Sequence, residues 1–113
     1  MIKGTFERDE AGRIVRFELR GHAEAGPYGS DIVCAAVSAL AISAVNGMEA
    51  LAGFEPDIDV NEMEGGYLAC TVIPDITQEQ LNISQILLEN LYLALEQIQV
   101  ENAEYIQIKT THV

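Results

Sequence analysis

Apolar and polar residues alternate in two short runs near the start of the chain, residues 2–8 and 14–20. Alternation with a period of two is typical of strands that bury one face. Residues 9–12 between the runs carry turn formers, so the pattern predicts a β-hairpin. Gly21 then interrupts the pattern, because glycine permits a bend or a close backbone approach. The positions expected to face inward are Ile2, Gly4, Phe6, Val15, Phe17 and Leu19.

The longest apolar segment, residues 32–45, is rich in Ala and Ser and predicts a helix over about residues 31–52. Ser30 or Asp31 is expected to cap its N-terminus, and Gly53 to end it. An apolar run of this length suits a buried helix better than a membrane span. Its many small residues would let a neighbouring element approach closely.

A second hairpin is expected over residues 57–61 and 67–73, with a turn between them and Pro74 closing the unit. The return strand is apolar on both faces, which favours a central place in the sheet. Thr77 and Gln80 then form a capping-box signal before a long helix at about 78–101.

That long helix carries two apolar stripes, and residues 105–110 read as a last short strand. One stripe can pack on the sheet, whereas the other is spare apolar surface that suggests a partner, most simply a second copy of the chain. The first stripe consists of Leu81, Leu88, Leu91, Leu95 and Ile98, and the second of Ile86, Leu93 and Val100.

The order of elements, ββαββαβ, predicts an α+β two-layer sandwich in which a mostly antiparallel sheet packs against two long helices. At 113 residues, the chain is expected to form a single domain over residues 1–113.

The charge balance narrows the choice of partners, since 18 acidic residues face only 6 basic ones for a formal net charge of −12. This balance disfavours direct binding to nucleic acid, which depends on Lys and Arg, and favours a basic partner or none. The start of the chain lacks the apolar core of a signal peptide, so we expect a cytoplasmic protein with reduced thiols and no membrane contact.

Cys34 and His22 are the candidate reactive pair, separated by a loop at residues 23–30 that is rich in turn formers. In the predicted helix, Cys34 falls in the first turn, where unpaired N–H groups and the helix dipole favour thiolate. A nearby imidazole could serve as proton acceptor and donor. On spacing alone, a small buried hydrophobic cysteine is an equally good interpretation.

The other candidate ligands and nucleophiles carry weaker signals. Cys70 lies in mid-strand and is expected in the core, while His112 is expected in a solvated tail. No short metal-ligand spacing links these residues, so we expect neither a metal nor another cofactor. Ser38 follows Cys34 by one helical turn, and Asp31 is the one candidate for a third catalytic residue, in competition with its capping role.

Three stretches together resemble the signature of the ribosomal-processing cysteine protease family Prp. They are Gly21-His22-Ala23, the Gly29-x-Asp31 step, and the eight residues from Asp31 to Ser38. The resemblance implies a bacterial cytoplasmic homodimer that removes a short N-terminal extension from a large-subunit ribosomal protein, cutting after a pair of aromatic residues. It implies Cys34 as nucleophile and His22 as general base and acid, with Gly21, Asp31 and Ser38 in support.

The mechanism expected from this reading has the thiolate of Cys34 attacking a peptide carbonyl. Backbone N–H groups at the start of the helix, including that of Cys34, would receive the oxyanion. The loop at 23–30 would open and close over the peptide, and Tyr28 would line its pocket. The alternative from another class is a non-catalytic ribosome-assembly module that binds the same or another basic protein without cutting it.

Overall fold

The computed structural model describes residues 1–21, 28–61 and 66–113, with the backbone alone for residues 28–31. The chain runs in the order ββαββαβ, as predicted. Its elements are β1 (Ile2–Arg8), β2 (Ile14–Arg20), α1 (Tyr28–Gly47), the π-helical turn η1 (Met48–Ala52), β3 (Asp57–Asn61), β4 (Tyr67–Thr71), α2 (Gln78–Glu101) and β5 (Ile106–His112).

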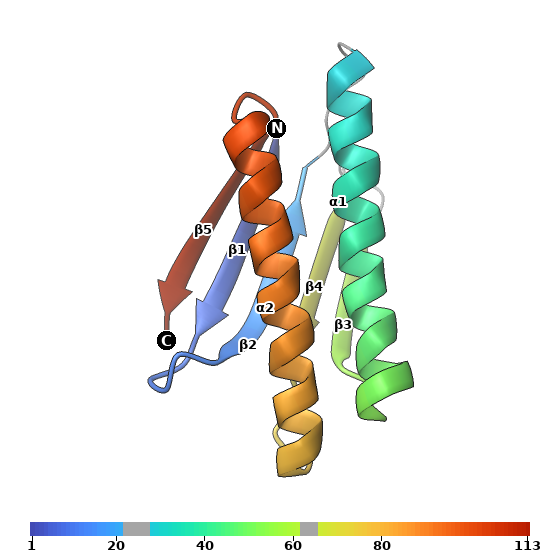
Figure 1. Cartoon of the computed structure of the whole chain (residues 1–113), viewed down its shortest axis with the longest axis vertical. Helices are drawn as coiled ribbons and strands as arrows, with labels where there is room; N and C mark the ends of the chain where they lie inside the picture. Colours follow the sequence, from blue (N-terminus) through green and yellow to red (C-terminus); the bar gives the residue numbers. More distant parts are fainter. Residues whose placement is uncertain (22–27, 62–65) are drawn as a thin grey trace.

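The five strands form one sheet in the order β3-β4-β2-β1-β5. The β1–β2, β2–β4 and β3–β4 pairs are antiparallel, and only β5 pairs in parallel, with β1. Both helices lie on the same face of the sheet (Figure 1). The predicted α+β sandwich with a mostly antiparallel sheet is therefore confirmed.

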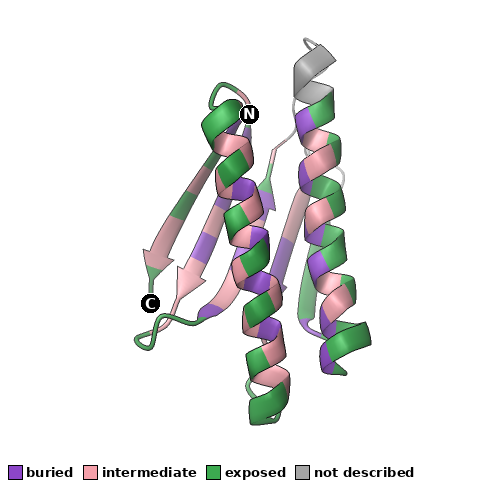
Figure 2. Cartoon of the chain, viewed as in Figure 1, coloured by how far each residue is buried: buried purple, intermediate pink, exposed green. Residues whose placement is uncertain are grey.

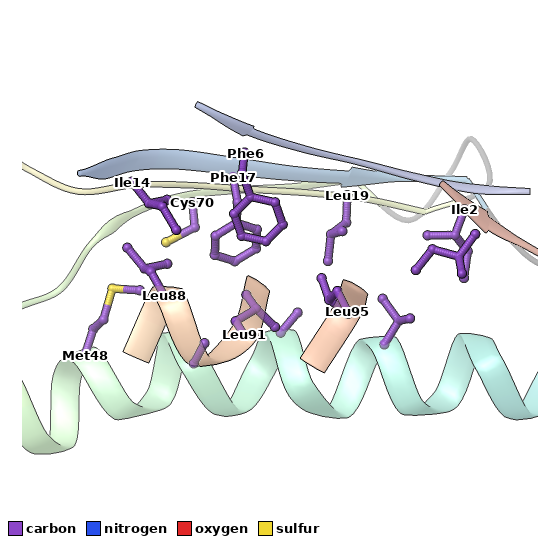
Figure 3. Packing of buried hydrophobic residues seen from close by; sticks show 14 of the residues in the cluster. Ile2, Phe6, Ile14, Phe17, Leu19, Met48, Cys70, Leu88, Leu91 and Leu95 are labelled. Atoms are coloured by element: carbon purple, nitrogen blue, oxygen red, sulfur yellow. The ribbon is translucent and has the colours of Figure 1, made fainter. Parts of the chain in front are cut away.

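The hydrophobic core lies between the sheet and the helices (Figure 3). Phe6 and Phe17 stack at 5.7 Å between ring centroids, and Tyr92 of α2 meets Phe6 edge-on at 5.0 Å. The first predicted stripe of α2 faces this layer, with its central members Leu88, Leu91 and Leu95 buried.

The register of β2 differs from strict alternation at its start. Arg8 pairs with Ile14, whereas Glu7 pairs with Arg16, so the pairing shifts by one residue between them. Ile14 is consequently fully buried, while Val15 is only half-buried. A bulge inserts one unpaired residue and turns the preceding side chain into the core. The prediction that the side chain faces the core is confirmed for Phe17 and Leu19 and is only partly right for Val15.

The first helix begins at Tyr28, three residues earlier than predicted. Ser30 and Asp31 are therefore helical residues rather than caps, and the predicted loop at 23–30 loses its last three residues to the helix. The short polar side chains of Ser30 and Asp31 favour an N-cap but also fit the interior of a first turn, so the capping preference alone does not fix where the helix begins. At the other end, Gly53 closes the segment as predicted, with φ +81° and its N–H donating to the Met48 carbonyl.

Helices α1 and α2 approach each other closely. A Cβ atom added at Gly47 would lie 3.1 Å from the Leu87 side chain, so any larger residue there would require Leu87 to shift. The segment Ile32–Ala52 is long and apolar enough to cross a membrane by length and composition. In the fold, however, one side of it joins the core through residues such as Val37, Ala41 and Met48.

The second stripe of α2 is exposed as predicted, with 70% of Ile86, 63% of Leu93 and 77% of Val100 accessible. Exposed positions recur along the length of α2 (Figure 2). All five residues of β3 are exposed as well, at the end of the sheet.

Candidate active site

Cys34 lies in the wall of a pocket of about 540 Å³ that is lined mainly by apolar atoms. α1 supplies one side of this pocket through Cys34, Ser38 and Ile42, because residues four apart share a helix face. The ends of β2, β3 and β4 supply the other side, through Leu19, Gly21, Val60, Gly66, Tyr67 and Leu68 among others. Cys34 is half-buried there, which leaves its thiol within reach of a molecule in the pocket.

Gly21 shapes the floor of the pocket through its backbone. Its φ is +94°, and an added Cβ would lie 2.3 Å from the Met1 carbonyl oxygen, so only glycine fits. Its N–H donates to the Gly66 carbonyl at 3.0 Å, which joins the end of β2 to the start of β4. The residue that immediately precedes His22 is therefore fixed in the lining of the same pocket that Cys34 lines from the α1 side.

Ser38 lies one turn beyond Cys34 in the same pocket, as expected from its spacing. His22 lies outside the described residues, as do the side chains of Tyr28 and Asp31. The structure thus brings together Gly21, Cys34 and Ser38, and leaves the Cys34–His22 pairing as a prediction.

The position of Cys34 in its helix corrects the expected electrostatics. Because α1 begins at Tyr28, Cys34 is its seventh residue and lies beyond the first turn. Only the first four N–H groups of a helix lack an acceptor inside it. The N–H of Cys34 is consequently part of the helical ladder, and the expectation that it receives the oxyanion is wrong for this structure. The dipole argument for thiolate at Cys34 weakens for the same reason, since the effect decays within one turn.

Cys70 confirms its expected place in the core, where it is 1% exposed. Burial, with a smaller contribution from Asp57, raises the pKa of the Cys70 thiol to about 12. A thiol with such a pKa is a poor nucleophile near neutral pH. The structure therefore separates the two cysteines by environment, one in a pocket wall and one in the core.

His112 is exposed, as expected, but it ends β5 and pairs in register with Arg8 rather than lying in a tail. Within the described ranges, no group of three or more His, Cys, Asp or Glu residues is arranged to hold a metal ion.

A polar network supports the sheet on the face away from the helices. Arg16 binds Glu7 at 3.3 Å and Glu18 at 3.1 Å, and Arg20 binds Glu18 at 2.6 Å. The Tyr67 hydroxyl accepts from Arg16 at 3.2 Å, and Arg20 lies over the Tyr67 ring. Burial acts to raise the pKa of Glu18, but hydrogen bonds from Arg20 and Arg16 outweigh it and hold that pKa below its ordinary value. These contacts tie β1, β2 and β4 together beneath the pocket.

The strand residues of the pocket wall are not predictable as site residues from the sequence, because they carry no reactive side chain. Val60 and Leu68 are aligned across the β3–β4 pair, so they share one sheet face. The period-two pattern of residues 57–61 and 67–73 already indicated this shared face. Nothing in the pattern indicated that α1 would leave a space above it.

Comparison with known proteins identifies a family with a similar sequence. Residues 1–107 match the sequence profile of the family described as cysteine protease Prp. The ribosomal processing cysteine protease Prp of Bacillus subtilis is 36% identical over 110 residues, covering 97% of each chain. The Prp protein of Staphylococcus aureus strain Mu50 is 30% identical over 108 residues, covering 96% of this chain and 97% of its own.

Solved structures of related sequence share this fold. The crystal structure of SMU.848 from Streptococcus mutans superposes with a TM-score of 0.89 at 35% identity, covering 100% of this chain and 96% of that one. The S. aureus ribosomal processing protease Prp, solved in complex with a substrate peptide, gives a TM-score of 0.84 at 26% identity. That match covers 98% of this chain and 100% of the other.

Proposed function

Because this chain belongs to the Prp family of cysteine proteases, we propose that it is a cytoplasmic endopeptidase that removes the N-terminal extension of a large-subunit ribosomal protein. Its relatives are named ribosomal processing proteases, and the S. aureus protein has been solved with a substrate peptide. The observation that carries the proposal is the position of Cys34, half-buried in the wall of an apolar pocket of about 540 Å³.

In the proposed reaction, Cys34 is the nucleophile and His22 the general base and acid. The imidazole of His22 takes the proton from Sγ, and the thiolate forms a C–S bond with the scissile carbonyl carbon. The C–N bond then breaks as the imidazolium donates its proton to the leaving amine. Water, deprotonated by the same imidazole, hydrolyses the thioester and returns the thiol to Cys34.

The supporting roles follow from the resemblance and from what the pocket contains. Gly21 sets the backbone immediately before His22, and Ser38 offers a hydroxyl to the imidazole or the peptide from the same wall as Cys34. Asp31 and Tyr28 are proposed as a supporting carboxylate and a substrate contact. The segment before α1 is proposed to open and close over the bound peptide.

The pocket suits cleavage after an aromatic residue. Its lining is mainly apolar, with Val37, Ala41 and Leu68 among its walls, and aromatic side chains gain the most from such burial. The rest of the charge pattern favours a basic substrate, since residues 21–108 contain no Lys or Arg.

A homodimer is the proposed quaternary structure. The stripe formed by Ile86, Leu93 and Val100 is apolar and exposed over the length of α2, and a second copy would cover it.

The decisive experiment mixes the purified protein with the extended ribosomal protein precursor and determines product masses. We expect a single new N-terminus after an aromatic residue, and no product with Cys34→Ser at unchanged circular dichroism. Cys70→Ala, tested where it remains folded, should still cut, because Cys70 is buried in the core and does not line the pocket. A precursor that binds but stays intact with the wild-type protein would contradict the protease and support the assembly module.

A further inference from the structure

β3 is the end strand of the sheet within the described part of the chain. It pairs with β4 on one side, and it ends the strand order. A strand edge presents N–H and C=O groups that can pair with another extended chain. Proteins commonly protect such edges with charged side chains, proline or a bulge. Residues 57–60 read Asp-Ile-Asp-Val, so the charges of β3 are all negative, and the strand keeps a regular register with β4.

The two faces of β3 differ in chemistry. Ile58 pairs with the core residue Cys70, and Val60 with Leu68, so this parity lies on the helix side of the sheet. Val60 lines the pocket together with Cys34. Asp57 and Asp59 have the opposite parity and lie on the uncovered face. An extended chain placed beside β3 would therefore alternate between an apolar pocket and a pair of carboxylates.

The negative charge of this edge favours one class of extended chain as its partner. Asp57 and Asp59 are exposed, and Glu55 precedes them. The other edge of the sheet, β5, has no acidic residue and carries Lys109, which pairs with Thr5, two residues from Lys3 of β1. A cationic segment would thus be attracted to β3 and repelled from β5.

We propose that the substrate binds as a sixth strand along β3, with alternate side chains entering the Cys34 pocket and the intervening basic side chains meeting Asp57 and Asp59. This inference rests on the proposed protease function and specifies how the peptide is held. Main-chain hydrogen bonds to β3 supply affinity, and the two faces of the strand supply specificity.

The strand geometry predicts different roles for two adjacent aromatic residues of the substrate. Neighbouring side chains of an extended strand point to opposite faces, so only one of the two enters the pocket. Replacing that aromatic by alanine is expected to lower kcat/KM by roughly a hundredfold, and replacing the other by less than about tenfold.

The first test is amide hydrogen exchange on the full-length Cys34→Ala variant. The probe is a synthetic peptide with two adjacent phenylalanines followed by alternating alanine and lysine. Addition of the peptide is expected to slow exchange in residues 57–61 and to leave β5 unchanged. Protection of β5 alone, or of neither edge, would overturn the inference. Protection of β3 before peptide is added, lost on dilution, would also overturn it by identifying a second copy as the occupant.

The second test measures cleavage by the wild-type protein of the same peptide, N-methylated at one residue at a time. Loss of one edge hydrogen bond is expected to lower kcat/KM about tenfold at every second position. Asp57→Asn combined with Asp59→Asn should lower it about threefold to tenfold for the lysine peptide, and not for its glutamine counterpart. Glu101→Gln combined with Glu104→Gln changes net charge equally at the end of α2 and should have no effect.

These measurements distinguish the proposed strand addition from the proposed protease activity. Cleavage without a period of two in the methylation series overturns strand addition and leaves the protease standing. Protection of β3 by the peptide with no cleavage by the wild-type protein overturns the protease and supports strand addition.

Discussion

Cys34 and Cys70 should differ sharply in reactivity because one lies in a pocket wall and the other in the core. With its pKa raised to about 12, Cys70 has roughly a thousandth of the thiolate of an ordinary cysteine at pH 8. We expect iodoacetamide to modify Cys34 at least about tenfold faster in the folded protein. Mass spectrometry of peptides measures both rates.

Denatured protein provides the control, since both thiols should then react alike. Trypsin cannot separate the two cysteines, because residues 21–108 contain no Lys or Arg, so a Glu-specific protease is needed. The His22→Ala variant should slow alkylation of Cys34 and leave that of Cys70 unchanged. Equal, slow alkylation of both thiols would argue against a reactive Cys34.

Gly21→Ala is expected to be costly in both stability and activity. The positive φ disfavours alanine, and the new methyl group would collide with the Met1 carbonyl. We expect a loss of about 2–4 kcal/mol in the free energy of unfolding, measured by urea titration. Gly12→Ala is a matched control with φ +84° and open space around the added carbon, and it should lose only about 1 kcal/mol. Equal losses at both sites would contradict the close approach to Met1.

At the residue scale, the sequence predicts local relations best. The spacing of Cys34 and Ser38 predicts that they share a helix face, and both line one pocket together with Gly21. The first-turn placement of Cys34 failed because Asp31 fits both a cap and the interior of a first turn, with a difference of only about 1 kcal/mol. A free-energy difference this small is decided by tertiary packing, about which a local sequence pattern carries no information.

At the scale of the element, the start of α2 depends on its capping box. The Thr77 hydroxyl accepts from the Gln80 N–H at 3.1 Å, and the Gln80 side chain accepts from the Thr77 N–H at 3.0 Å. Thr77→Ala is expected to lower the free energy of unfolding by about 1 kcal/mol, measured by denaturant titration. Gln97→Ala, at an exposed position far from the capping box, should change it by less than about 0.5 kcal/mol.

The ion pair between Arg8 of β1 and Glu89 of α2 should make stability depend on pH. The hydrogen bond from Arg8 lowers the pKa of Glu89 below its ordinary value. Since the folded pKa is depressed, this stabilisation is complete above pH 5 and is lost as the pH falls through the folded pKa. Glu89 is 43% exposed, so Glu89→Gln should cost only about 0.5 kcal/mol at pH 7. Urea titrations should show a smaller difference at pH 3, and an equal difference at both pH values would contradict the ion pair.

Elements were predictable in the sequence when their pattern was regular. The α2 bounds and both hairpins followed from periodicity and caps. The bulge that buries Ile14 did not, since it arises from the pairing of β2 with β1. The parallel pairing of β5 with β1 likewise joins distant segments, and nothing within residues 106–112 specifies that neighbour.

For the whole molecule, the proposed dimer predicts a concentration-dependent mass. Leu93 is 63% exposed in the single chain, so Leu93→Glu should leave folding intact while placing two charges in the apolar contact. Sedimentation velocity should show a dimer for the wild type and a monomer for Leu93→Glu. Gln107→Glu is the matched control, since it adds the same charge at an exposed position of β5, away from α2, and should remain dimeric. A wild-type monomer at all concentrations tested would overturn the proposal.

The place of β1 between β2 and β5 has a consequence for biosynthesis. Residues 2–8 are translated early, but their parallel partner, residues 106–112, emerges only after both helices have been made. Until then the nascent chain carries β1 with one bare edge, and Phe6 lacks its Tyr92 contact. Pairing over such a distance is slow to form, and unpaired edges invite misassembly. Folding is thus expected to finish only once translation has passed residue 112, which delays any cutting activity until β5 has been made.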